Sequence, residues 1–307
     1  MNVSQALASQ DEFDASWSER WIGFLDASQK TIETYSRALK QFIVFLAMHN
    51  ISKPTRETII AYRDSLKSMY KPSTAQIYLV AVRLFFRWTS LEGLYQDIAD
   101  NVKGVKIDRC HKKDYLTTKQ LTDLLGSVDR STLRGKRDYA MLTLMATTGL
   151  RTISIIRANV GDIGVIGDFS VLFYQGKGRD DKGEYVKLVA QVEDAIRDYL
   201  RCRGDAKANE PLFSAVANRN IGGRMTTRSV SRSVKEHLGD IGLTSERLTA
   251  HSLRHTAATL NLLNGGTLEE TQQLLGHSSI NTTMIYSHAL ERAKNASEER
   301  IAKAIFG

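Results

Sequence analysis

The chain has 307 residues, of which 42% are hydrophobic and 25% are charged. This composition is that of a globular protein rather than a disordered or fibrous one, and the length predicts about two domains. Lysine and arginine number 42 against 34 acidic residues, which gives a net charge of +8. The basic excess is spread over both halves and favours a polyanionic partner, although solubility alone would also explain it.

The sequence carries no sign of export or of membrane insertion. The first residues, MNVSQALASQDEFD, lack the basic start and apolar core of a signal peptide. No apolar run approaches the roughly 20 residues of a membrane helix. Cys110 and Cys202 match no metal-ligand or redox spacing. We therefore expect a cytoplasmic protein without membrane contact.

Residues 15–102 are predicted to be helical. In TIETYSRALKQFIVFLAMHN the apolar residues recur at helical spacing. Further helices are predicted over TRETIIAYRDSLKSM, which opens at Thr55, and over STAQIYLVAVRLFFRWTSLEG, which ends at Gly93. Basic residues interleave with aromatic ones on these helices and fit either a DNA-facing stripe or a solvated helix face: Arg37, Lys40, Arg83 and Arg87.

The division that we predict is a helical N-terminal domain over 1–102, a linker over 103–114 and a second domain over 115–307. The linker rests on NVKGVKIDRCHKKD, which is polar, basic and without periodicity. After it, Thr117 and Gln120 predict a capped helix, and RDYAMLTLMATTG predicts a helix that stops at Gly149. SVLFYQGKGRDDKGEYVKLV has two β-prone runs around a Gly-rich turn, which predicts a hairpin.

Four motifs in the second domain carry candidate site residues. Two are short, Gly149-Leu150-Arg151 and Gly176-Lys177-Gly178; the others are AHSLRHTAATLNLLNGG, predicted to be a helix, and LLGHSSINTTMIYSH, which follows a capped helix that ends at Gly276. Taken singly, each is more often a turn, a surface residue or a packing residue. Their order is the stronger signal: Arg151, Lys177, His251, Arg254, His277 and Tyr286.

This order resembles the tyrosine recombinase (phage integrase) family. The motifs that match are TTGLR, GKG, HSLRHTAAT and LGHSSINTTMIYSH, and through them the resemblance covers about residues 115–290. The resemblance implies a mainly α-helical fold with a small β-hairpin or sheet. It implies a helical core-binding domain, as in Xer-type enzymes, followed by an α+β catalytic domain.

The same resemblance implies a role for each residue of the series. Arg151 and Arg254 would bind the phosphate, and Tyr286 would be the nucleophile. Lys177 would be the hairpin lysine that protonates the leaving 5′-oxygen. The two active-site histidines would be His251, our first candidate for the base, and His277, which would hydrogen-bond the phosphate.

Two departures from the family pattern stand out. Ser154 occupies the position, three residues after the first arginine, where the family usually has a glutamate, so the support that orients Arg151 is changed. Asp180 and Asp181 stand in the hairpin where family members tend to be basic, which disfavours DNA contact at the hairpin tip.

The residue types suit cleavage of a phosphodiester by a tyrosine. A phenol has a pKa of about 10 and needs a base to lose its proton, and two guanidiniums can neutralise the phosphorus centre in place of a metal. Because no clear Asp/Glu cluster exists, we expect neither a metal ion nor a cofactor. A 3′-phosphotyrosine product conserves the bond energy, so a 5′-hydroxyl can rejoin the strand without ATP.

The function that the sequence predicts is site-specific DNA recombination, most simply integration, excision or resolution of a mobile element. Alternatives are Xer-like resolution of chromosome dimers, a type IB topoisomerase-like or hairpin-telomere activity, and a catalytically inactive sequence-specific DNA-binding protein. The expected partners are double-stranded DNA core sites and a homotetramer on two sites, with accessory proteins allowed. An apolar stripe after Tyr286 docks either on its own domain or on a neighbouring protomer: Leu290, Ala293, Ser297, Ile301 and Ile305.

Overall fold

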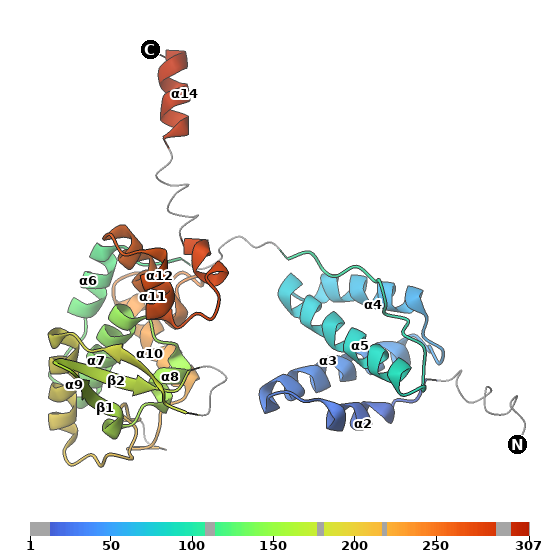
Figure 1. Cartoon of the computed structure of the whole chain (residues 1–307), viewed down its shortest axis with the longest axis horizontal. Coiled ribbons are helices and arrows are strands. Elements are labelled where there is room, and N and C mark those ends of the chain that lie inside the picture. Colours follow the sequence, from blue (N-terminus) through green and yellow to red (C-terminus); the bar gives the residue numbers. More distant parts are fainter. Residues whose placement is uncertain (1–12, 108–113, 177–180, 217–219, 287–295, 307) are drawn as a thin grey trace, which may run out of the picture. The chain divides into compact units, whose positions relative to one another are not determined.

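The computed structural model describes residues 13–107, 114–176, 181–216, 220–286 and 296–306 (Figure 1). The chain divides into two compact units, Met1–Cys110 and His111–Gly307. Each unit has its own hydrophobic core. None of the helices in the described ranges is long and apolar enough to cross a bilayer.

The first unit consists of helices around an aromatic core. The helices are α2 (Trp17–Phe24), α3 (Gln29–Met48), α4 (Arg56–Met69) and α5 (Pro72–Leu91) (Figure 1). Helix α5 contacts the other three, because residues on several of its sides are apolar. Phe42, Phe85 and Phe86 are fully buried there, and their rings meet edge to face. The helices predicted over this unit are confirmed.

The chain that follows α5, the last helix of the first unit, also packs into the core of that unit. Val102 and Val105 are buried, and the amide of Val105 donates to Oε1 of Gln76, 2.7 Å away. The segment that is polar on average therefore packs at its apolar positions. Arg37, Lys40 and Arg87 are exposed, which fits both interpretations of the basic residues.

The second unit is built on one buried helix. Helix α7 (Leu133–Thr148) buries 11 of its 16 residues and packs against α6 (Thr118–Gly126), α9 (Ala190–Arg203) and α11 (Ala250–Leu263). The remaining elements are α8 (Thr152–Arg157), the 3₁₀ turn Val160–Asp162, α10 (Thr227–Asp240) and α12 (Leu268–Leu275). This mixture of many helices with a small sheet confirms the predicted fold class.

The helix ends follow the local sequence signals. The Thr117 hydroxyl accepts from the amide of Gln120 at the start of α6, as the capping pattern predicts. Gly149 ends α7 and Gly276 ends α12, each in the left-handed conformation with φ of 62° and 55°. Residues in this conformation are most often glycine. These two glycines determine where α7 and α12 end, and both lie beside the candidate active site.

The sheet has three antiparallel strands in the order β1-β2-β3: Ile163–Ile166, Phe169–Tyr174 and Glu184–Lys187. The predicted hairpin between β2 and β3 is confirmed, with Tyr174 paired to Glu184 across it. Strand β1 is not predicted from the sequence. It is only four residues long and has glycine at its second position, so it lacks a recognisable alternation.

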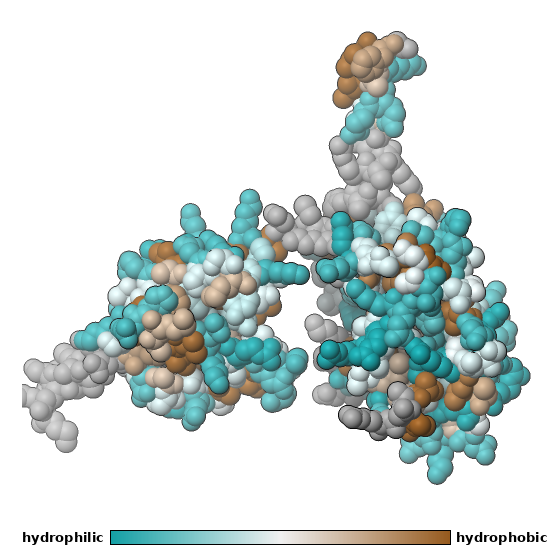
Figure 2. Space-filling model, turned by 180° about the vertical axis from the view of Figure 1, so that it is seen from behind, coloured by the Kyte–Doolittle hydropathy of each residue, from teal (hydrophilic) through white to brown (hydrophobic). Residues whose placement is uncertain are grey.

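The last described element is α14 (Ser297–Phe306), and it buries none of its residues. Ile301, Ile305 and Phe306 are 58%, 65% and 83% exposed. Hydrophobic residues gather on one side of this helix, brown in Figure 2. Leu290 and Ala293 lie outside the described residues. Docking of the described part of the stripe on its own domain is therefore not observed.

Candidate active site

Arg254 is the most buried cation of the predicted series, with 3% of its surface exposed. Its two terminal nitrogens donate to backbone oxygens of Gly149 and Leu275, each 2.6 Å away. Both carbonyls belong to helix ends, those of α7 and α12, where they lack partners within the helix. Arg254 thus fixes its guanidinium to two elements, and N–H groups remain available because the side chain has five.

The close meeting of these elements depends on glycine at position 149. A Cβ atom at Gly149 would lie 2.7 Å from Cδ2 of Leu275 and 3.3 Å from Cβ of Ala257. These distances are shorter than normal carbon contacts, so a side chain there would separate α7 from α11 and α12. Gly149 therefore permits the packing that holds Arg254.

Arg151 follows two residues later, at the start of α8, and is partly exposed. Burial, and then the positive charge of Arg151, lower the pKa of Arg254 to about 10. Among the described residues, neither guanidinium forms an ion pair with a carboxylate. The two arginines thus create a positive site whose charge is not balanced by a neighbouring acid.

His277 begins where α12 ends. Its amide donates to the Gln272 carbonyl (3.1 Å) and its carbonyl accepts from Nε2 of Gln272 (2.9 Å), which fixes the backbone. Nδ1 of the ring lies 2.8 Å from the hydroxyl of Thr283, which is fully buried. Burial, and then the charges of Arg254 and Arg151, lower the pKa of His277 to about 4. The imidazole is therefore neutral at neutral pH.

Residues 281–286 are helical, and Tyr286 among them is 6% exposed. Its ring packs in a small cluster with Ala258 and Leu275. Burial raises the pKa of Tyr286, while the charges of Arg254 and Arg151 act in the opposite direction. The phenol is protonated at rest, so it must lose its proton as it attacks a substrate.

A further histidine, His255, lies between His251 and Tyr286. The ring of His255 is 4.6 Å from that of His251 and 5.3 Å from that of Tyr286, measured between centroids. His255 is buried, whereas His251 is exposed at the start of α11. The sequence analysis missed His255, although its i, i+4 spacing from His251 places both on one helix face.

The structure brings together Arg151, Arg254, His277 and Tyr286, with His251 close enough to influence His277. Lys177, with Gly178 and Asp180, lies outside the described residues. The rest of the described hairpin shows Asp181 exposed. In the described ranges there is no group of three or more His, Cys, Asp or Glu side chains that could hold a metal ion.

Ser154 is buried, and its hydroxyl donates to the backbone carbonyl of Gln175, 3.0 Å away. It therefore holds the end of β2 rather than a guanidinium. The carboxylate that the sequence comparison expects at this position is absent from α8. A different acid, Glu184 of β3, lies beside Gly276 at the end of α12.

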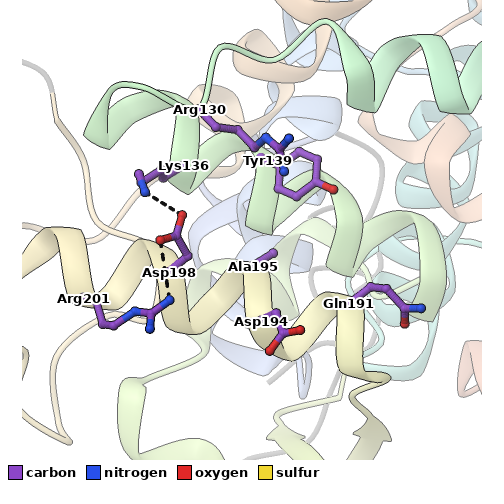
Figure 3. A pocket seen from close by; sticks show the side chains of 8 residues that line it. All are labelled: Arg130, Lys136, Tyr139, Gln191, Asp194, Ala195, Asp198 and Arg201. Carbon is purple, nitrogen blue, oxygen red and sulfur yellow. Dashed lines mark hydrogen bonds and ion pairs between the residues drawn. The ribbon is translucent and has the colours of Figure 1, made fainter.

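A separate hollow between α7 and α9 also contains cations, but these are already paired (Figure 3). Lys136 lies 2.6 Å from Asp198, and Arg201 lies 3.7 Å from the same carboxylate. Arg130 stacks over the ring of Tyr139, 4.6 Å from its centroid. The hollow thus lacks the unbalanced charge of the Arg151–Arg254 site.

Comparisons with known proteins agree with this geometry. The sequence pattern of the Phage integrase family matches residues 114–292, and that of the phage integrase N-terminal SAM-like domain matches residues 20–95. A protein named tyrosine recombinase XerC from Pelobacter propionicus is 31% identical, covering 90% of this chain and 91% of its own. One of the same name from Herpetosiphon aurantiacus is 30% identical, covering 88% and 89%.

Solved structures share the fold at lower identity. XerH recombinase bound to a palindromic difH substrate, in a post-cleavage complex, gives a TM-score of 0.73 at 22% identity, covering 93% of this chain and 85% of that one. A lambda integrase tetramer bound to a Holliday junction gives 0.69 at 17% identity, covering 93% and 80%. The chain belongs to the phage integrase family and is a tyrosine recombinase of the Xer-like kind.

Proposed function

We propose that this chain is a site-specific recombinase that cuts and rejoins double-stranded DNA through a 3′-phosphotyrosine intermediate. The observation that carries the proposal is the pair of guanidiniums without an acidic partner among the described residues, beside a buried tyrosine. Like charges in a poorly hydrated place repel each other, and a phosphodiester anion between them would relieve that repulsion. The anion would then lie within reach of Tyr286.

In the proposed reaction the phenol oxygen of Tyr286 attacks phosphorus, and the bond from phosphorus to the 5′-oxygen breaks. The phenol proton passes to a base, for which His251 is the candidate, and the leaving 5′-oxygen takes a proton from Lys177. These two roles rest on the family motifs. A 5′-hydroxyl of another strand reverses the steps and restores a phosphodiester.

Arg151 and Arg254 would neutralise the charge that gathers on the phosphate oxygens. The neutral ring of His277 would add a hydrogen bond from Nε2, provided that the Thr283 hydroxyl donates to Nδ1 and leaves the proton on Nε2. Cations held by the fold do the work that divalent metals do in many nucleases, so the chemistry requires neither metal nor cofactor.

The partners that we propose are DNA core sites and three further copies of the chain. Relatives of the same fold were solved on DNA substrates and as a tetramer on a Holliday junction, which supports this assembly. The basic charge of the chain supports DNA binding that weakens as salt is added. Accessory proteins are compatible with the scheme.

Recombination of a mobile element is the role that we propose first. Resolution of chromosome dimers is the second candidate, and the relatives named XerC favour it. The two differ in where the protein attacks DNA. Covalent complexes trapped in cells and sequenced would map to element ends in the first case and to one chromosomal site in the second.

The test of the reaction is covalent trapping on the DNA identified in that way. Tyr286→Phe should bind this DNA with unchanged affinity yet form no protein–DNA adduct, because only the attacking oxygen is lost. Arg151→Ala should retain binding but form adduct about 10²–10³-fold more slowly, as losing one group that stabilises transition-state charge typically costs. Wild-type adduct should form at the same rate in excess EDTA.

Tyr185→Phe is a matched control, because it removes a hydroxyl from an exposed tyrosine of the same unit. An adduct with Tyr286→Phe would refute the nucleophile, and a strict need for Mg²⁺ would refute the metal-free scheme. If the wild type binds its site tightly and never forms an adduct, the chain is instead a sequence-specific DNA-binding protein without catalysis.

A further inference from the structure

Two side chains of the hairpin meet at the edge of the arginine site. Tyr174 ends β2 and Glu184 begins β3, and they face each other as cross-strand partners. Tyr174 is 5% exposed and Glu184 is half-buried. Burial, and then a hydrogen bond to Glu184, raise the pKa of Tyr174 to about 12. The Tyr174 hydroxyl therefore stays protonated and donates to the carboxylate.

This pair fills the space between two glycines that adjoin the site. Oε2 of Glu184 lies 3.1 Å from the position of a Cβ atom on Gly176 and 3.4 Å from that on Gly276. The hydroxyl of Tyr174 lies 3.0 Å from the same Gly276 position. The end of β2 and the end of α12 thus both pack against the Tyr174–Glu184 pair. Gly276 directly precedes His277.

Tyr174 also lies within the electrostatic reach of the two arginines. Arg151 and Arg254 both act electrostatically on the hydroxyl of Tyr174, the partner of Glu184. Neither arginine makes an ion pair with it, so their N–H groups stay available to a phosphate.

Ser154 holds the same strand end from the other side. Its hydroxyl donates to the carbonyl of Gln175, the residue between Tyr174 and Gly176. The end of β2 is therefore tied to α8 by Ser154 and to the α12 turn by the Tyr174–Glu184 pair. In this chain the Ser154 hydroxyl binds a backbone carbonyl, and Glu184, the acid beside Gly276, belongs to β3.

We propose that Tyr174 and Glu184 are positioning residues for DNA cleavage, which hold the end of β2 against the Gly276–His277 turn. The inference rests on the proposed recombinase chemistry. It assigns the pair a role in cleavage and none in DNA affinity, because neither side chain needs to touch DNA.

The experiment compares Glu184→Gln, Tyr174→Phe and the double variant in single-turnover adduct formation, together with DNA affinity and melting temperature. Glu184→Gln keeps the shape and can still accept from Tyr174, but removes the charge. Each single variant should form adduct about 10–100-fold more slowly, since a misplacement of about 1 Å costs on the order of 10²-fold. The double variant should be no slower than the worse single one, because the residues act as a unit.

Asp181→Asn is the control, because it removes a negative charge from an exposed position of the same hairpin; it should match the wild type. Unchanged adduct rates in both single variants would overturn the inference. So would slower cleavage that is accompanied by equal losses of affinity and melting temperature, which would mean a purely structural role. If wild-type protein forms no adduct at all, the proposed function fails, and that result is distinct from either of these.

Discussion

The ring of His277 is held through Nδ1 by the hydroxyl of Thr283, and this contact decides which nitrogen is offered to a phosphate. With a lowered pKa, the ring carries one proton at neutral pH. If Thr283 donates to Nδ1, that proton is on Nε2, where it can reach the substrate. Thr283 therefore acts on the tautomer as well as on the orientation of the ring.

Thr283→Val should slow adduct formation about tenfold while DNA affinity stays within twofold, because the variant keeps the volume and removes the donor; loss of one hydrogen bond also costs about 1 kcal/mol of stability. Thr282→Val, an exposed neighbour, serves as the control and should behave like the wild type. The rates are measured under single turnover with saturating protein. A Thr283→Val protein of normal rate would show that the hydroxyl does not set the tautomer.

At the scale of elements, α7 and α10 are joined by a buried acid. Asp138 on α7 is fully buried, contacts Arg137 and lies 3.2 Å from Nε2 of His237 on α10. Burial alone would raise the pKa of Asp138, but the hydrogen bond from His237 and the charge of Arg137 outweigh it and lower that pKa. The same hydrogen bond raises the pKa of His237 above its ordinary value.

The raised pKa of His237 decides how the stability of the fold depends on pH. The folded protein holds the His237 proton more tightly than the unfolded chain, so this stabilisation is complete below a pH of about 6.5 and is lost as pH rises through the folded pKa. His237→Gln should remove about 1–3 kcal/mol at pH 5.5, and less at pH 9. An equal difference at both pH values would contradict the assignment.

Hydrogen exchange of α7 amides is the suitable measurement for this prediction. All three tryptophans, Trp17, Trp21 and Trp88, belong to the first unit, so their fluorescence does not report on α7. Asp240→Asn is a control, because Asp240 makes a longer and more exposed contact (3.4 Å) with the same histidine.

The sequence predicted those elements whose signals are local. The capping residues Thr117 and Thr267 and the stop signals Gly149 and Gly276 act within one helical turn, so their helix ends could be predicted. Strand β1 could not, because its four residues are stabilised by pairing with β2 rather than by their own pattern.

The residues of the candidate site also divide into those that local motifs predict and those that they do not. The motifs named the arginines, His277 and Tyr286, which the structure brings together. His255 and Thr283 lie inside the motifs, but their contacts with Tyr286 and His277 appear only in the folded structure; Glu184 comes from another element and meets the turn at Gly276 through a tertiary contact. The hydrogen bond from Ser154 to the carbonyl of Gln175 is likewise a long-range contact that residue spacing does not encode.

For the whole molecule, the exposed end of the chain is the feature with the widest consequence. Helix α14 has 10 residues, fewer than the roughly 12–15 that make an isolated helix even marginally stable in water. Its apolar side chains gain stability only by docking. We expect the docking surface to belong to a neighbouring protomer of the proposed tetramer.

Removal of residues 297–307 should leave binding to a single DNA site within about twofold of the wild type and abolish pairing of two sites and complete strand exchange, because coupling between subunits typically amounts to a few kcal/mol. Gel shifts with one and two sites measure the first two properties. A milder variant, Ile301→Asp with Ile305→Asp, tests the stripe without shortening the chain. Normal recombination by either protein, or unfolding of the truncated one, would refute this role.

The attachment of Arg254 to the carbonyls of Gly149 and Leu275 has a consequence for how the protein loses activity on heating. Proteins open locally well below their melting temperature, and a small helix near the chain end is among the parts that open first. Each time α12 detaches, the guanidinium loses one of its two anchors, so the fraction of molecules able to cut DNA falls with that opening. Heat inactivation should therefore precede melting and reverse on cooling, which makes strand cleavage a reporter of local order in the domain.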